Sequence, residues 1–205
     1  MSVRLKDMRG FTLTELMVTV GVLGVMAAFA MPNLIAWKTT IGVNSAARDL
    51  ISEMQVCRMK AVSERNNYVI TFDATNNQYT VHDDNDSDGI LDEVGSNASN
   101  GDESSKGPID LPDDIRFGRA SGGINIVSST GTNIDSDGIH VTGDTLTFEP
   151  DGTPTSVNTE SVYIIPTNDD ESNEQRTHRW RAISVNVTGR IKLWTYDGDL
   201  APPWE

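Results

Sequence analysis

Glu15 has the most unusual chemical setting in the sequence, because it stands at the start of a long apolar run. From Leu16 to Ala36 the chain is apolar except for Thr19 and Asn33. An ionised carboxylate at the centre of a bilayer-spanning helix costs on the order of 2.5–3.5 kcal/mol, and less near a helix end. A carboxylate at this position requires a cationic partner, and we therefore predict a functional role for Glu15.

A second candidate site is an acidic run in which carboxylates alternate along the chain. This run resembles the D-x-D-x-D-G-x-x-D loops of calcium-binding repeats, in which alternate carboxylates converge on one hard cation and a glycine permits the sharp turn. Gly95 stands where an EF-hand has its closing glutamate, so we predict weak affinity. The alternative is a solvated surface loop that binds no metal. The candidate calcium ligands are Asp84, Asp86, Asp88, Ile90, Asp92 and Glu93.

The other reactive residue types give no indication of an enzyme. Cys57 is the only cysteine, so neither an intramolecular disulfide nor a thiolate metal cluster can form. The three histidines are far apart, and the sequence lacks the common nucleophile, P-loop and zinc-protease motifs. We expect no enzymatic activity and no required cofactor, with calcium as the one possible ligand.

The elements that must position Glu15 are a basic leader and a membrane-spanning helix. Leu16–Ala36 contains 21 residues, or roughly 31 Å of helix at about 1.5 Å per residue, which is enough to cross a hydrocarbon core of about 30 Å. Arg4, Lys6 and Arg9 precede this segment, and positive charges favour the cytoplasmic side of a bacterial inner membrane. We therefore predict a single span followed by a periplasmic domain.

Two alternatives remain open for this N-terminus. An ordinary signal anchor explains the span and the charges, but gives Glu15 no role. A secretory signal is the other alternative, because Ala28-Phe29-Ala30 has the A-x-A form of a leader-peptidase site. The mature protein would then be a soluble periplasmic protein that begins at Met31.

The run RG-FTLTELMVTVGVLGVMAAFAMP resembles the type III signal sequence of type IV pilins and type II secretion pseudopilins. The resemblance implies that a prepilin peptidase cuts between Gly10 and Phe11 and then N-methylates Phe11. It also implies that Glu15 neutralises the free amine of a neighbouring subunit, and pairing makes both charges tolerable in an apolar filament core. The implied partners are other pilin or pseudopilin subunits, the prepilin peptidase and an inner-membrane assembly platform.

The periodicity of the remaining chain predicts a helix packed on an antiparallel sheet, which is an α+β architecture. To about Arg65 apolar residues recur at spacings of three and four, and the stripe includes Cys57, which we predict to be buried and inert. The period then changes to two, and Thr188-Gly189 predicts a tight turn between the last two strands. The stripe comprises Val43, Ala47, Leu50, Met54, Cys57 and Ala61; the predicted strands are 68–72, 78–82, 124–127, 146–148, 161–165, 180–187 and 190–195.

Two short motifs, F-x-P-x-G at Phe148–Gly152 and strand-TGR-strand at Val185–Leu193, are similar to the GspH/FimT group of minor pseudopilins and pilins. The resemblance implies the pilin fold and a non-catalytic structural subunit of a type IV pilus or type II secretion pseudopilus. The expected organisation is a cleaved leader at 1–10, a transmembrane and filament-core helix at 11–37, its sheet-packing second half at 38–66, and a periplasmic β-rich domain at 67–205. Within that domain we expect an acidic loop at about 83–122.

A FimT-like DNA-binding pilin is the alternative function. Gly189-Arg190-Ile191-Lys192 is similar to the GRxR pattern of DNA-binding members of that group, and Arg176, Arg179 and Arg181 could extend a basic patch. The net charge is −14, and it becomes −16 without the first ten residues, which hold three basic side chains and one acidic side chain. Such a surface repels nucleic acid at long range, so we expect Arg190 and Lys192 to form a solvated strand face and DNA not to be a partner.

Overall fold

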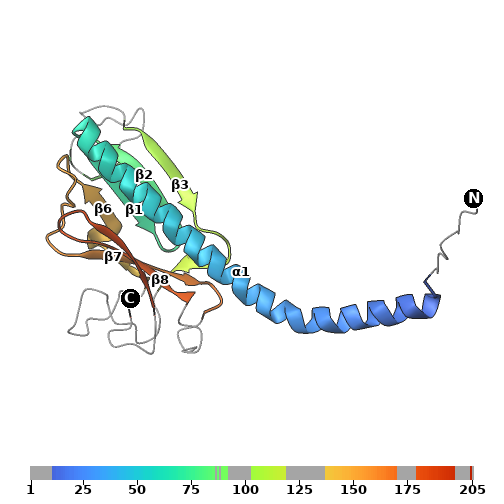
Figure 1. The fold of residues 1–205 in the computed structure, drawn as a ribbon. Coiled ribbons are helices and arrows are strands. Elements are labelled where there is room, and N and C mark those ends of the chain that lie inside the picture. Colours follow the sequence, from blue (N-terminus) through green and yellow to red (C-terminus); the bar gives the residue numbers. More distant parts are fainter. Residues whose placement is uncertain are drawn as a thin grey trace, which may run out of the picture. The chain divides into compact units, whose positions relative to one another are not determined.

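The computed structural model describes residues 11–85, 87, 89–91, 103–118, 137–169, 179–196 and 204, with only the backbone of residues 32–36. The chain divides into two compact units, at 1–38 and 39–205. One long helix, α1 (Leu13–Glu64), begins in the first unit and ends in the second. The strands, labelled in Figure 1 where there is room, are β1 (Asn67–Asp73), β2 (Gln78–Asp84), β3 (Ser105–Asp110), β4 (Ile115–Phe117), β5 (Ile139–His140), β6 (Thr145–Phe148), β7 (Glu160–Pro166), β8 (Arg181–Val185) and β9 (Ile191–Thr195), with a short 3-10 turn η1 (Thr142–Asp144) before β6.

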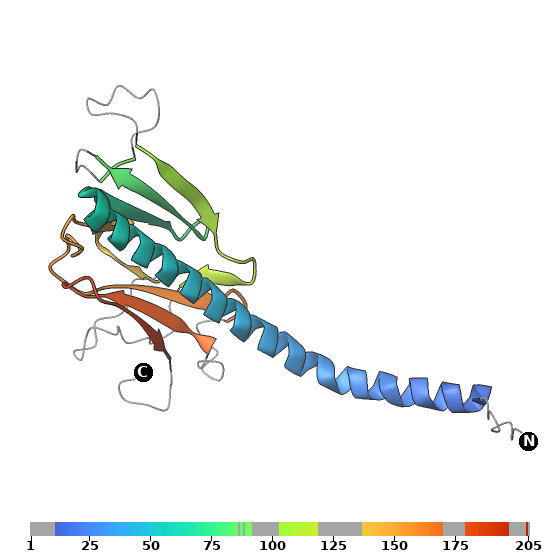
Figure 2. The same cartoon turned by 45° about the horizontal axis from the view of Figure 1, so that its top comes forward.

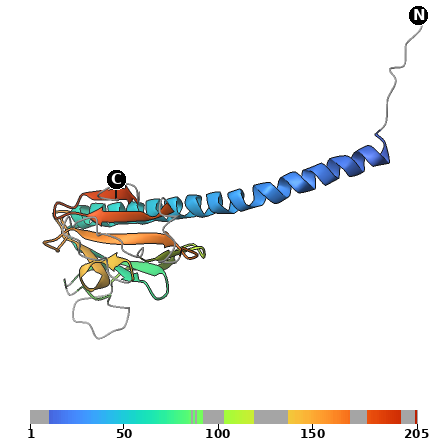
Figure 3. The same ribbon diagram turned by 90° about the horizontal axis from the view of Figure 1, so that it is seen from below.

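The second unit contains two antiparallel sheets. One has the strand order β3-β2-β1-β6, and the other has the order β4-β7-β8-β9 with β5 also paired to β7. Figures 2 and 3 show the later part of α1 running along these strands. This arrangement is the α+β pilin fold that the sequence predicts. Six of the seven predicted strands are present, and the seventh, at 124–127, lies outside the described residues.

The main hydrophobic core lies between α1 and both sheets. Each of the six residues of the predicted stripe is at most 1% exposed, which confirms the stripe, including the burial of Cys57. They pack against alternate residues of the strands, as expected when side chains of a strand point to opposite faces. The sheet residues of this core include Tyr68, Ile70, Phe72, Leu146, Phe148, Val162, Ile164, Ile183 and Val185.

A second, smaller core covers the other face of the second sheet. Tyr163 and Ala182 point to this face, where Trp180 and Trp204 pack with them, and Tyr196 forms an isolated bridge with Trp204. The rings of Tyr163 and Trp204 lie 5.4 Å apart between centroids, a spacing typical of favourable aromatic pairs. Strands β7 and β8 are therefore buried on both faces.

Strands β3 and β4 and the end of β2 lie inside the segment that we predicted as an acidic loop, so that prediction is wrong for residues 83–84, 105–110 and 115–117. Strand β3 is mostly exposed and pairs along the edge of β2, whereas Leu111 and, in β4, Ile115 and Phe117 are buried in the main core. Lys106 of β3 also forms an ion pair with Glu53 of α1. A count of charges over the whole segment does not reveal these buried residues.

Arg58 of α1 joins the two glycine turns that carry the short sequence motifs. Its Nε donates a hydrogen bond to the carbonyl oxygen of Gly152 at 2.8 Å, and its Nη2 donates to that of Thr188 at 3.2 Å. Gly152 and Gly189 both have positive φ, at 80° and 74°, which favours glycine. The planar guanidinium can bond both carbonyls at once, so α1 holds the two turns together.

Replacing Arg58 by methionine is expected to lower the free energy of unfolding by about 2–3 kcal/mol, because two hydrogen bonds from a charged group are lost. Arg58→Lys keeps the charge and the apolar stem, but an ammonium group lacks the fork that reaches both carbonyls. The lysine variant should therefore recover less than half of the loss in chemical denaturation of the full chain in detergent. Wild-type stability of Arg58→Lys would mean that charge alone matters here.

Burial also determines the reactivity of Cys57. It raises the pKa of the Cys57 thiol to about 12, with a smaller contribution from the negative charge of Glu53. Since the thiolate is the nucleophile, the folded chain should not react with iodoacetamide at mildly alkaline pH. Quantitative alkylation is expected only after denaturation, and mass spectrometry measures both states; rapid alkylation of the folded chain would contradict the burial.

Candidate assembly interface

The N-terminus of α1 is capped by a residue that our sequence analysis did not identify. Thr12 precedes the helix, and its Oγ1 accepts a hydrogen bond from the backbone N–H of Glu15 at 3.2 Å. The backbone N–H of Leu16 donates to the carbonyl oxygen of Thr12, also at 3.2 Å. Thr12 and Glu15 have the T-x-x-E spacing of a capping box, and this spacing could have predicted the cap from the sequence. The cap defines where the apolar helix begins.

Glu15 lies in the first turn of α1, and its side chain is exposed within the chain. A negative charge in the first turn of a helix is favoured by the helix macrodipole, typically by about 0.3–1 kcal/mol. Phe11, the residue after the predicted cleavage point, is 80% exposed. Gly10 lies outside the described residues. The side chains of both residues that the assembly prediction concerns, Glu15 and Phe11, are thus exposed within the described chain.

The first part of α1 presents an unpacked apolar surface. Residues Leu13–Met31 have a mean hydropathy of 1.9, and none of them is buried. Three successive side chains, Leu16, Met17 and Val18, are each at least 59% exposed, so the helix is apolar around its circumference. The hydroxyl of Thr19 donates a hydrogen bond to the carbonyl oxygen of Leu16 at 2.8 Å, so this polar group has its partner within the helix. Such a surface requires lipid or other apolar helices around it.

The candidate calcium loop is only partly described. Asp84 is buried and one of its carboxylate oxygens accepts a hydrogen bond from the backbone N–H of Gly89 at 3.2 Å. Ile90 is 65% exposed. The other candidate ligands, Asp86, Asp88, Asp92 and Glu93, lie outside the described residues. Within the described part of the chain no three His, Cys, Asp or Glu residues group as metal ligands, and calcium binding stays a prediction.

Two family models match the chain. The model of the prokaryotic N-terminal methylation motif matches residues 5–31, which include Phe11 and Glu15. The model of the type II transport protein GspH matches residues 46–189, more than half of the chain and both glycine turns held by Arg58. The chain belongs to the GspH family. It is thus a minor pilin or pseudopilin, a structural subunit with a membrane-anchoring N-terminal helix.

The solved structures of similar proteins share low sequence identity with this GspH-family chain. The type IV minor pilin FimU of Pseudomonas aeruginosa PAO1 is 18% identical, with a TM-score of 0.43, over 80% of this chain and 91% of that one. The minor pseudopilin EpsH from the type II secretion system of Vibrio cholerae is 10% identical, with a TM-score of 0.45, over 75% and 96%. No curated protein sequence matches the chain.

Among the described residues, the basic side chains of the DNA-binding alternative do not form one patch in this GspH-family chain. Arg181 is buried and donates from Nε to Oδ1 of Asn44 at 2.8 Å, and Arg179 forms an ion pair with the buried carboxylate of Asp169. Our suggestion that these two arginines extend a patch is wrong, because both serve the interior of the domain. Arg190 and Lys192 are exposed, and the Lys192 ammonium lies 3.2 Å from the centroid of the Trp194 ring. Arg176 lies outside the described residues.

Proposed function

We propose that a prepilin peptidase cuts the chain between Gly10 and Phe11 and that the product assembles with other pilin or pseudopilin subunits. In the membrane the helix that begins at Leu13 spans the bilayer once, with the second unit in the periplasm. In the filament the same helix surface packs against helices of neighbouring subunits. The role is mechanical, and it involves no reaction beyond the processing of the leader.

The observation that carries this proposal is a carboxylate in the first turn of an otherwise apolar, unpacked helix. Thr12 caps the helix, which begins at Leu13, so cleavage after Gly10 leaves only Phe11 and Thr12 ahead of the helix. Both the new amine and the Glu15 carboxylate are costly in an apolar environment when alone. Pairing them between subunits compensates for that cost, whereas an ordinary membrane anchor gains nothing from Glu15.

The experiment is to follow the tagged full chain in a bacterium that makes the cognate filament, with and without its prepilin peptidase. We expect the chain in the sheared filament fraction only when the peptidase is present. Without the peptidase it should remain in the inner membrane. Recovery of a soluble periplasmic product in both strains would overturn the proposal.

A further inference from the structure

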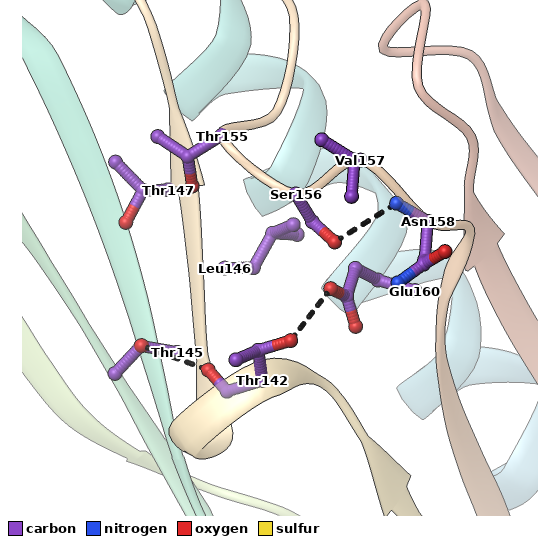
Figure 4. A pocket seen from close by; sticks show the side chains of 9 residues that line it. All are labelled: Thr142, Thr145, Leu146, Thr147, Thr155, Ser156, Val157, Asn158 and Glu160. Atoms are coloured by element: carbon purple, nitrogen blue, oxygen red, sulfur yellow. Dashed lines mark hydrogen bonds between the residues drawn. The ribbon is translucent and has the colours of Figure 1, made fainter.

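A polar pocket separates the edge of the first sheet from the beginning of strand β7. Its volume is about 310 Å³, and three segments line it: η1, strand β6, and the connection from β6 to β7. Figure 4 shows Leu146 in the middle of the lining, with Thr145 and Thr147 on one side of it and Ser156 and Glu160 on the other. Five of the nine residues that line it carry a hydroxyl group: Thr142, Thr145, Thr147, Thr155 and Ser156. Pockets that take small ligands begin at about 300 Å³, so this one suits a single side chain or a small molecule.

One charged residue, Glu160, lines this pocket, and it is only 4% exposed. One carboxylate oxygen accepts a hydrogen bond from Thr142 Oγ1 at 3.2 Å, and Figure 4 shows the carboxylate directed toward Thr142 and the pocket. Among the described residues no lysine or arginine forms an ion pair with it. A buried carboxylate without a cation is destabilising, since desolvation is not offset by an opposite charge. Within the described part of the chain, Glu160 therefore has no cationic partner for its buried carboxylate.

The lining restricts which cation can supply that charge. A divalent cation needs several charged oxygens, and the pocket offers one carboxylate. A guanidinium prefers a carboxylate with both oxygens available, but one oxygen of Glu160 already accepts from Thr142. An ammonium has three donors on one compact centre, which suits one carboxylate oxygen with surrounding hydroxyl acceptors. The pocket chemistry therefore favours a primary ammonium group.

We propose that this pocket binds the ammonium group of a lysine side chain from a neighbouring filament subunit. Val157, at the rim of the pocket, is 86% exposed, and it offers apolar contact to the carbon stem of a lysine and to the surface that carries it. A free small amine would use the same carboxylate but would gain little from Val157. The inference rests on the proposed function for the source of the lysine, whereas the ammonium chemistry depends on the pocket alone.

The first test is a titration of the isotope-labelled full chain in detergent micelles, monitored by the backbone amide signals of Thr142, Thr145 and Ser156. The probe is N-acetyl-lysine methylamide, and the matched control is N-acetyl-norleucine methylamide, which lacks the ammonium. We expect shifts with the lysine probe only, and Glu160→Gln should weaken binding about tenfold or more. Equal shifts with both probes, no shifts, or unchanged binding by Glu160→Gln would each overturn the proposal.

Thermal denaturation separates a binding role of Glu160 from a structural one. Without a ligand, Glu160→Gln should leave the midpoint unchanged or raise it, because the variant removes an uncompensated buried charge while retaining an acceptor for Thr142. Glu149→Gln, outside the pocket, is the matched control for loss of one carboxylate. A clear decrease of the midpoint in Glu160→Gln alone would mean that the charge is structural, which contradicts the proposal.

Photo-crosslinking in assembled filaments identifies the source of the ammonium. A benzophenone amino acid is placed at Val157, and in a separate chain at Met17 on the apolar helix as a control for incorporation. We expect crosslinks to another subunit from both positions, with the Val157 crosslink reduced at least tenfold by Glu160→Gln. A Met17 crosslink without a Val157 crosslink would overturn the lysine source while the proposed function stands. Absence of both crosslinks would overturn the proposed function and, with it, the origin of the lysine in a neighbouring subunit. If the lysine probe still bound in the titration, the pocket would be assigned to a free amine.

Discussion

Replacing Gly189 by alanine is expected to lower the free energy of unfolding by about 2–5 kcal/mol. The loss has two causes, a strained backbone conformation and a steric overlap in a packed region. A Cβ at this position would overlap the carbonyl oxygen of Gly152 and lie 2.9 Å from Nε of Arg58. The obstacle is backbone, which cannot turn aside as a flexible side chain can. Thermal denaturation of the full chain in detergent should show a decrease of about 10 °C in the midpoint.

Gly143→Ala is the matched control for this prediction. Gly143 has a φ of 67°, close to the 74° of Gly189, but the nearest atom to a Cβ there is Thr145 Oγ1 at 3.9 Å. It therefore carries the left-handed strain without the overlap, and we expect a loss of only about 1–2 kcal/mol. Equal losses in the two variants would show that the approach of the two turns at Arg58 contributes nothing to stability.

Replacing Glu15 by glutamine is expected to reduce the amount of the chain in sheared filaments at least tenfold, with its level in the membrane unchanged. Glutamine is nearly isosteric, but it leaves the amine of the neighbouring subunit without a counter-charge in an apolar core. Quantitative immunoblotting of the filament and membrane fractions measures both levels.

Asp49→Asn provides the control for Glu15→Gln. Asp49 is another carboxylate of α1, exposed on the part of the helix that packs on the sheets. Its replacement removes the same charge and should leave incorporation at the wild-type level. Incorporation of Glu15→Gln equal to that of Asp49→Asn would mean that the intramembrane carboxylate has no role in assembly.

Local periodicity explains why the helix and most of the strands could be predicted from the sequence. The spacing of Val43, Ala47 and Leu50 reports one face of a helix, since side chains three and four positions apart share a face. In the same way alternation identified β1 and the β8–β9 hairpin. These patterns depend only on residues close together in the chain, so they can be recognised without knowledge of the tertiary structure.

The features that could not be predicted depend on contacts between distant segments. Arg58 bonds residues 94 and 130 positions away, and nothing near it in the sequence indicates either contact. The setting of Glu160 is also nonlocal, because η1, β6 and the connection between the sheets must meet before its carboxylate is enclosed. At the N-terminus the processing residues came from a resemblance, whereas the Thr12 cap was a local signal that we did not use.

Cleavage between Gly10 and Phe11 can be measured from the intact mass and the N-terminal peptide of the membrane-bound product, made from the full chain together with a prepilin peptidase. We predict a chain that begins at Phe11 and carries one methyl group on its amine. A chain that begins at Met31 would contradict assembly through the N-terminal helix, because it would lack Glu15 and most of the apolar segment and would be a secreted domain.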